Sequence, residues 1–70
     1  MNKFYEIGLM PNDNADDAYS LYVKTEDKLK GSTPEKVQYL VENNLIPDSK
    51  AKDVIYIQPC TEKEYEWSIN

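Results

Sequence analysis

The length of the chain, 70 residues, is the feature that most limits its fold. A chain of this size has room for one domain, residues 1–70, and buries only about 60% of the surface that it exposes when unfolded. Its core is therefore expected to be one layer deep, which leaves little room for an internal ligand cavity. We accordingly expect any functional site to be a surface, a shallow groove or a subunit interface.

Two segments near the N-terminus have the alternation of apolar and polar side chains that is typical of β-strands. The first is predicted at residues 3–10 and ends at Pro11, because proline cannot continue a strand ladder. The second is predicted at residues 18–25, and the Asn- and Asp-rich segment 12–17 between them is expected to be a loop. One predicted face carries Tyr5, Ile7, Leu9, Tyr19, Leu21 and Val23, and the other carries Phe4, Met10 and Tyr22.

A charged turn at residues 26–31 is followed by the pattern of an amphipathic helix. Ser32 and Glu35 have the spacing of a capping box, Thr33 is an equally good cap in an alternative register, and Pro34 suits the first turn. The apolar stripe of this helix consists of Val37, Leu40, Val41 and Leu45, and its outward face carries Glu35, Tyr39 and Glu42. The helix is expected to end at Asn43, Asn44 and Pro47.

The third predicted strand lies within residues 53–58 and ends at Pro59. Because residues 54–57 form a continuous apolar run, this strand is expected to be the most buried of the three.

The tail, residues 61–70, fits two structures. As a helix it begins with a capping box of Thr61 and Glu64. As a fourth strand it places Tyr65, Trp67 and Ile69 on one face. The capping box favours the helix.

Together these elements predict an α+β fold with the order β-β-α-β and a short C-terminal helix. In the expected three-stranded, mainly antiparallel sheet, the third strand lies beside the first and the long helix covers one face. The other face carries apolar side chains, and a patch of that kind is normally covered in a soluble monomer. We expect the tail to cover it by burying Tyr65 and Ile69, which favours a monomer, and a homodimer is the alternative.

The charged residues narrow the range of functions. The formal net charge is −5, all eight basic residues are lysines, and the chain has neither Arg nor His. Arg is the usual bidentate ligand of phosphate and guanine, so sequence-specific recognition of nucleic acid is not expected. The lack of His removes the commonest general base and the commonest metal ligand.

Three groups of residues resemble patterns that bind metal ions or catalyse reactions in other proteins. In this chain a structural role explains each of them better. The loop 12–17 lacks the Gly and Glu that a calcium loop requires at its sixth and twelfth positions. Glu62, Glu64 and Glu66 lie on a terminal segment, without the cleft that acid–base catalysis needs. The chain has no His, so a Lys or a helix N-terminus would have to lower the pKa of Cys60, and a helix N-terminus is available directly after it. We therefore predict that the protein is not an enzyme and has no catalytic, cofactor-binding or metal-binding residues.

Two further features predict a cytoplasmic protein. A single unpaired cysteine, Cys60, is typical of a reducing compartment. The sequence has no basic segment followed by an apolar run at its start and no apolar stretch near the ~20 residues needed to span a bilayer, so no membrane association is expected.

A resemblance to known proteins is found in two segments, Phe4-Tyr5-Glu6-Ile7-Gly8-Leu9 and Ala15-Asp16-Asp17-Ala18-Tyr19-Ser20. It continues faintly into residues 54–64. In these segments the chain resembles small acidic proteins, without an assigned activity, from mobile elements (phages or conjugative elements) of Gram-positive anaerobes. The resemblance implies an accessory role in such an element and assigns no function to individual residues.

The leading expectation is a protein-interaction or accessory module that binds a protein partner through an uncovered sheet face and an acidic surface. In the most specific version of this hypothesis, the carboxylates of that surface imitate the phosphates of DNA. Exposed aromatic side chains are typical anchors of protein interfaces, so the candidate partner-binding residues are Tyr39, Trp67 and Tyr22. The alternative is a small nucleic-acid accessory protein that uses sheet aromatics and the basic patch of Lys24, Lys28, Lys30 and Lys36. The negative charge and the lack of Arg count against this alternative.

Overall fold

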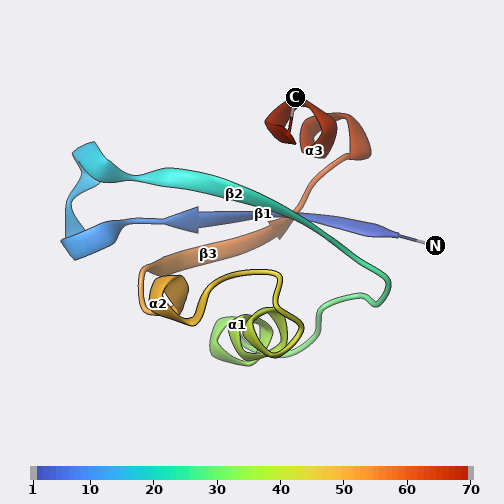
Figure 1. Ribbon diagram of the computed structural model, residues 1–70, viewed down its shortest axis with the longest axis horizontal. Helices are drawn as coiled ribbons and strands as arrows, with labels where there is room; N and C mark the ends of the chain where they lie inside the picture. The colour runs from blue at the N-terminus through green and yellow to red at the C-terminus, as the bar shows by residue number, and fades with distance from the viewer. Residues whose placement is uncertain (1, 70) are drawn as a thin grey trace.

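The computed structural model describes residues 2–69, without the side chain of Ile69. The expectation that Ile69 is buried therefore lies outside the described residues. The elements, in chain order, are strand β1 (Lys3–Leu9), the 3-10 turns η1 (Pro11–Asp13) and η2 (Ala15–Asp17), strand β2 (Tyr19–Thr25), helices α1 (Thr33–Glu42) and α2 (Asp48–Ala51), strand β3 (Val54–Pro59) and helix α3 (Glu62–Ile69). Helices α1 and α2 lie on one side of the sheet and α3 lies on the other (Figure 1).

The three strands form one antiparallel sheet in the order β2-β1-β3, which confirms the predicted α+β class and the position of the third strand beside the first. The β1–β2 register is unbroken from the pair Lys3 and Thr25 to the pair Leu9 and Tyr19. The β1–β3 register shifts between Gly8 and Leu9, where Ile55 is the extra residue of a β-bulge.

The core lies between the inner sheet face and α1. Its buried apolar side chains, among the described residues, are Tyr5, Ile7, Leu9, Val23, Leu29, Leu40 and Ile46. The odd-numbered residues of β1 form the inner row, as the alternation predicts. The hydroxyl group of Tyr5 also accepts a hydrogen bond of 2.9 Å from the backbone N–H of Leu29, which ties the segment after β2 to the sheet.

Helix α1 begins with the predicted capping box, and Ser32 rather than Thr33 is its cap. The backbone N–H of Glu35 donates to Ser32 Oγ (3.5 Å), and Ser32 Oγ donates to Glu35 Oε1 (3.1 Å). The helix ends at Asn43, as expected, and Asn44 adopts a left-handed conformation with φ of 58°. The short helix α2 was not predicted from the sequence.

Two sequence-based expectations about burial are wrong. Strand β3 is an edge strand and not the most buried one: the side chains of Ile55 and Tyr56 are 50% and 37% exposed. A continuous apolar run cannot distinguish a buried strand from an edge strand in which a bulge turns one side chain outward. Tyr39 is half-buried rather than outward-facing, because it packs against the core and lines a hollow together with Leu45 and the end of β2.

The tail is the helix α3, so the alternative of a fourth strand is wrong. Its predicted cap is present: the backbone N–H of Glu64 donates to Thr61 Oγ1 (3.1 Å), and the N–H of Thr61 donates to Glu64 Oε1 (3.1 Å). The helix contacts β1 and β2 on the outer face, where the rings of Phe4 and Tyr65 lie with centroids 5.2 Å apart. The tail thus covers part of the outer face, as expected.

Candidate functional site

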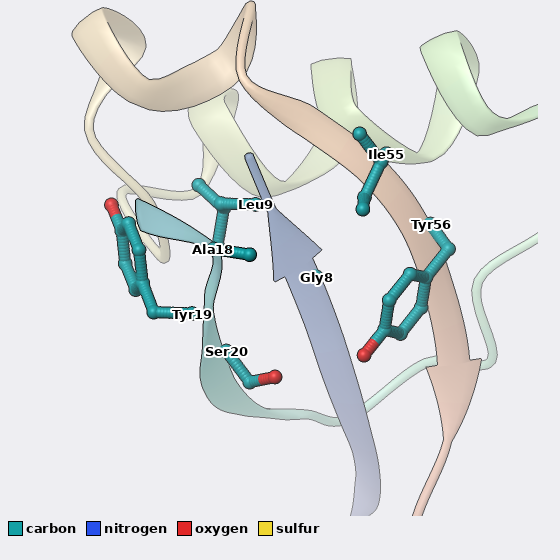
Figure 2. A pocket seen from close by; sticks show the side chains of 7 residues that line it. All are labelled: Gly8, Leu9, Ala18, Tyr19, Ser20, Ile55 and Tyr56. Atoms are coloured by element: carbon teal, nitrogen blue, oxygen red, sulfur yellow. The ribbon is translucent and has the colours of Figure 1, made fainter. Parts of the chain in front are cut away.

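The outer sheet face is divided into a covered half and an open half. Helix α3 covers the half that contains Phe4, and the other half contains a shallow hollow (Figure 2). The hollow is lined by Gly8, Leu9, Ala18, Tyr19, Ser20, Ile55 and Tyr56. Its volume of about 170 Å³ is well below the several hundred Å³ typical of small-molecule pockets. A small-molecule site is therefore not favoured here.

Gly8 gives the hollow its shape. Strand pairing places Gly8 opposite Tyr56, and the Tyr56 ring lies across the backbone of Gly8, where any Cβ would overlap it (Figure 2). An aromatic ring that packs on a strand glycine in this way covers the backbone that the glycine, without a side chain, would leave exposed. The glycine therefore holds a partly exposed tyrosine flat against the open half of the outer face.

A carboxylate, Glu6, lies at the centre of the outer face. Its Oε2 accepts hydrogen bonds from the hydroxyl groups of Ser20 (3.1 Å) and Tyr22 (3.3 Å), and its Oε1 accepts one from the amide of Gln58. The pKa of Glu6 lies below its usual value, first because of the bond from Gln58; partial burial opposes this shift, and the hydroxyl groups of Ser20, Tyr22 and Tyr56 add to it. The network joins all three strands and keeps a negative charge on this face.

This network predicts a specific pH dependence of stability. The folded-state pKa of Glu6 is depressed, so the stabilisation is present above the usual value of 4.5 and is lost as the pH falls through the folded-state pKa. We expect Glu6→Gln to lower the free energy of unfolding at pH 7 by about 1 kcal/mol, because the amide group accepts fewer hydrogen bonds. The difference between the two proteins should shrink below pH 4.5 in urea unfolding experiments, and a difference that stays constant from pH 7 to pH 3 would contradict the network.

The large apolar side chains that are exposed, among the described residues, are Ile55, Tyr56 and Trp67. Ile55 and Tyr56 line the hollow, and Trp67, at 71% exposure, lies in the last turn of α3. Helix α3 contacts β1 and β2, and Trp67 lies on it two residues after Tyr65, whose ring packs on Phe4. All three exposed side chains thus belong to elements that form or cover the outer face.

The candidate residues from the sequence are distributed around β2 and α3. Trp67 is exposed, as predicted. Tyr22 is half-buried and donates its hydroxyl hydrogen to Glu6, and Tyr39 lines a different hollow on the α1 side of the sheet. Ile55 and Tyr56 were not among the predicted residues, because they lie in the run expected to be buried.

The groups considered for catalysis have structural roles or lack activation. Burial, the largest cause, raises the pKa of the Cys60 thiol, and Glu64 and Glu6 raise it further, which opposes formation of a reactive thiolate. The carboxylate of Glu64 is occupied by the cap of α3. The segment 12–17 forms two tight turns, and the side chain of Asn14 accepts a hydrogen bond from the backbone N–H of Asp16.

Within residues 2–69 there is no group of three or more His, Cys, Asp or Glu side chains that could hold a metal ion. None of the described helices combines the length and the apolar character needed to cross a membrane. No family model, no curated protein and no solved structure matches the chain.

Proposed function

We propose that the chain is a non-enzymatic protein-interaction module, an accessory protein of a mobile element, that binds a protein partner through its outer side, which consists of the open half of the outer sheet face and the exposed surface of α3. The observation that carries this proposal is the position of Ile55, Tyr56 and Trp67, which are exposed on elements of one side of the molecule. Large apolar and aromatic side chains that are exposed on one side of a small protein favour a protein interface over a solvated surface.

The charges around the open face indicate what kind of partner surface fits it. Glu6 remains ionised at its centre, and the exposed Asp16 and Asp17 directly precede Ala18, which lines the hollow. The α3 side contributes Glu62 and further glutamates. A partner surface with apolar side chains surrounded by Lys or Arg would be complementary to this face.

The alternative of a nucleic-acid accessory protein gains no support from the positions of the aromatic side chains. It requires rings free to stack on bases next to the lysine patch. Tyr22 is half-buried and hydrogen-bonded to Glu6, and Tyr39 is half-buried against the core. We therefore retain protein binding as the proposed function.

The test is partner retention by surface variants of the immobilised full chain in a lysate of the host cell. Ile55→Asp and Trp67→Asp should each reduce retention of the same protein by at least about tenfold, because each places a charge in the apolar contact. Gln38→Asp is the matched control, since Gln38 is exposed on α1, on the other side of the sheet. A protein that the native chain and all three variants retain equally, or that only the Gln38→Asp variant fails to retain, would contradict the proposal.

A further inference from the structure

The two edges of the sheet differ in how well they are protected against pairing with another strand. Both β2 and β3 are edge strands, because β1 lies between them. Edges of natural sheets are usually protected by proline, bulges, charges or a covering segment, because their free N–H and C=O groups pair readily with other chains.

The edge of β3 has two such devices. The bulge at Ile55 interrupts its regular geometry, and Pro59 has no N–H to donate. Cys60 donates its N–H to the carbonyl oxygen of Phe4 (3.0 Å), so the backbone groups of Tyr56 and Gln58, at even positions like Cys60, also face β1. This leaves Ile57 as the only residue of β3 with a regularly placed outward N–H and C=O pair.

The edge of β2 has neither a proline nor a bulge, and the one charged residue within the strand is Lys24, near its C-terminal end. Since the backbone of Phe4 faces β3, the odd-numbered residues of β1 face β2, and they bond to the odd-numbered residues of β2. The N–H and C=O groups of Ser20, Tyr22 and Lys24 therefore point away from the sheet. Strand β2 has seven residues without proline, its register with β1 has no bulge, and no hydrogen bond from another described segment reaches these three backbones.

The two ends of the β2 edge carry opposite net charges, and this arrangement favours an added strand in the antiparallel orientation. The segment that precedes β2, residues 10–18, carries three aspartates and no lysine, a net charge of −3. Residues 24–30, at the other end, carry three lysines and two acids, a net charge of +1. An antiparallel second copy brings the acidic end of each β2 to the basic end of the other, whereas a parallel copy would oppose like ends.

We propose that the free edge of β2 pairs antiparallel with β2 of a second copy of this chain, with the two-fold axis at Tyr22. In this register Ser20 lies opposite Lys24 of the second copy, and Tyr22 lies opposite Tyr22 of the second copy. All the outward backbone groups of the edge are then paired, in about six hydrogen bonds. The result is a continuous six-stranded sheet, and a symmetric pairing of this kind closes at two chains.

The test exploits the alternation of backbone direction in β2. Ser20→Pro removes an outward N–H that makes no bond to β1, so it blocks pairing without breaking the existing ladder. Ser20→Ala is the matched control, because it removes the same side-chain hydrogen bond to Glu6 but keeps the N–H. We expect a concentration-dependent dimer for the native chain and for Ser20→Ala in sedimentation equilibrium. For Ser20→Pro we expect a dissociation constant at least about tenfold higher.

Hydrogen exchange of individual backbone amides in the native chain provides the second measurement, which remains decisive if Ser20→Pro does not fold. The amides of Tyr22 and Lys24 should exchange rapidly in dilute solution and become protected at concentrations where the dimer forms. A chain that is monomeric at millimolar concentration, with these amides unprotected, would overturn the proposal and leave the edge open to a strand of a different protein. A dimer that Ser20→Pro leaves intact would overturn it as well.

Discussion

Leu40→Ala is expected to lower the free energy of unfolding by about 2–5 kcal/mol, the range for a buried aliphatic side chain truncated in a core. Leu40 is fully buried, with 0% exposure, and it is the one side chain of α1 that is buried completely. A domain of this size has a total stability of roughly 4–10 kcal/mol, so the loss takes a large part of it. Urea unfolding followed by far-UV circular dichroism measures the change.

Two neighbours on α1 provide controls for this substitution. Gln38→Ala should change the stability by less than about 0.5 kcal/mol, because Gln38 is exposed. Tyr39→Ala should have an intermediate effect, above the ~1 kcal/mol expected for a solvated residue, because Tyr39 packs partly against the core. Equal losses at positions 38 and 40 would mean that the helix is rotated from the orientation described.

Deletion of residues 61–70 is expected to lower the melting temperature by at least about 10 °C and to cause association beyond the dimer proposed for the native chain. The deletion removes α3, separates Phe4 from Tyr65 and leaves Phe4 exposed on the outer face. Loss of such an aromatic contact and its buried area costs about 2–4 kcal/mol, and the exposed face then favours contact between chains. Differential scanning calorimetry and light scattering measure the two effects.

The control for the deletion is Trp67→Ala on the same helix. Trp67 is 71% exposed, so its removal should leave the melting temperature nearly unchanged. A truncated chain that keeps the native melting temperature and associates no further than the native chain would show that α3 does not stabilise the sheet.

The parts of the fold that follow from local sequence could be predicted. Each of the two capping boxes, Ser32 with Glu35 and Thr61 with Glu64, combines side-chain chemistry and spacing within four residues, and both are present. The alternation in β1 is equally local, and it identified the inner row that includes Ile7. These features depend on the backbone geometry of one segment and not on what packs against it.

The remaining core positions depend on tertiary packing and have no periodic signal. Leu29 lies alone between two lysines and Ile46 lies next to a proline, yet both are buried. Each reaches the core through contacts with residues far away in the sequence. The backbone N–H of Leu29, for example, donates a hydrogen bond to the hydroxyl group of Tyr5. Neither position belongs to a periodic pattern from which its burial could be predicted.

The candidate site could be predicted only in part. Trp67 was identified because helical spacing separates it from Tyr65, which faces the sheet. Ile55 and Tyr56 were missed, because an apolar run gives no information on a bulge that turns a side chain outward. Gly8, placed among β-branched and aromatic residues, was the available signal, since a strand glycine often marks a place where another group approaches the backbone closely.

Site-specific photocrosslinking in the host cell tests the proposed function most directly. A photoreactive residue is placed in the full chain at position 55, at position 67 or, as the control, at position 38 on α1. The account predicts one protein partner crosslinked from positions 55 and 67 and not from position 38, because the first two positions belong to the outer side of the sheet. Crosslinks from position 38 alone, or none from positions 55 and 67, would contradict the proposal that the open outer face binds a protein.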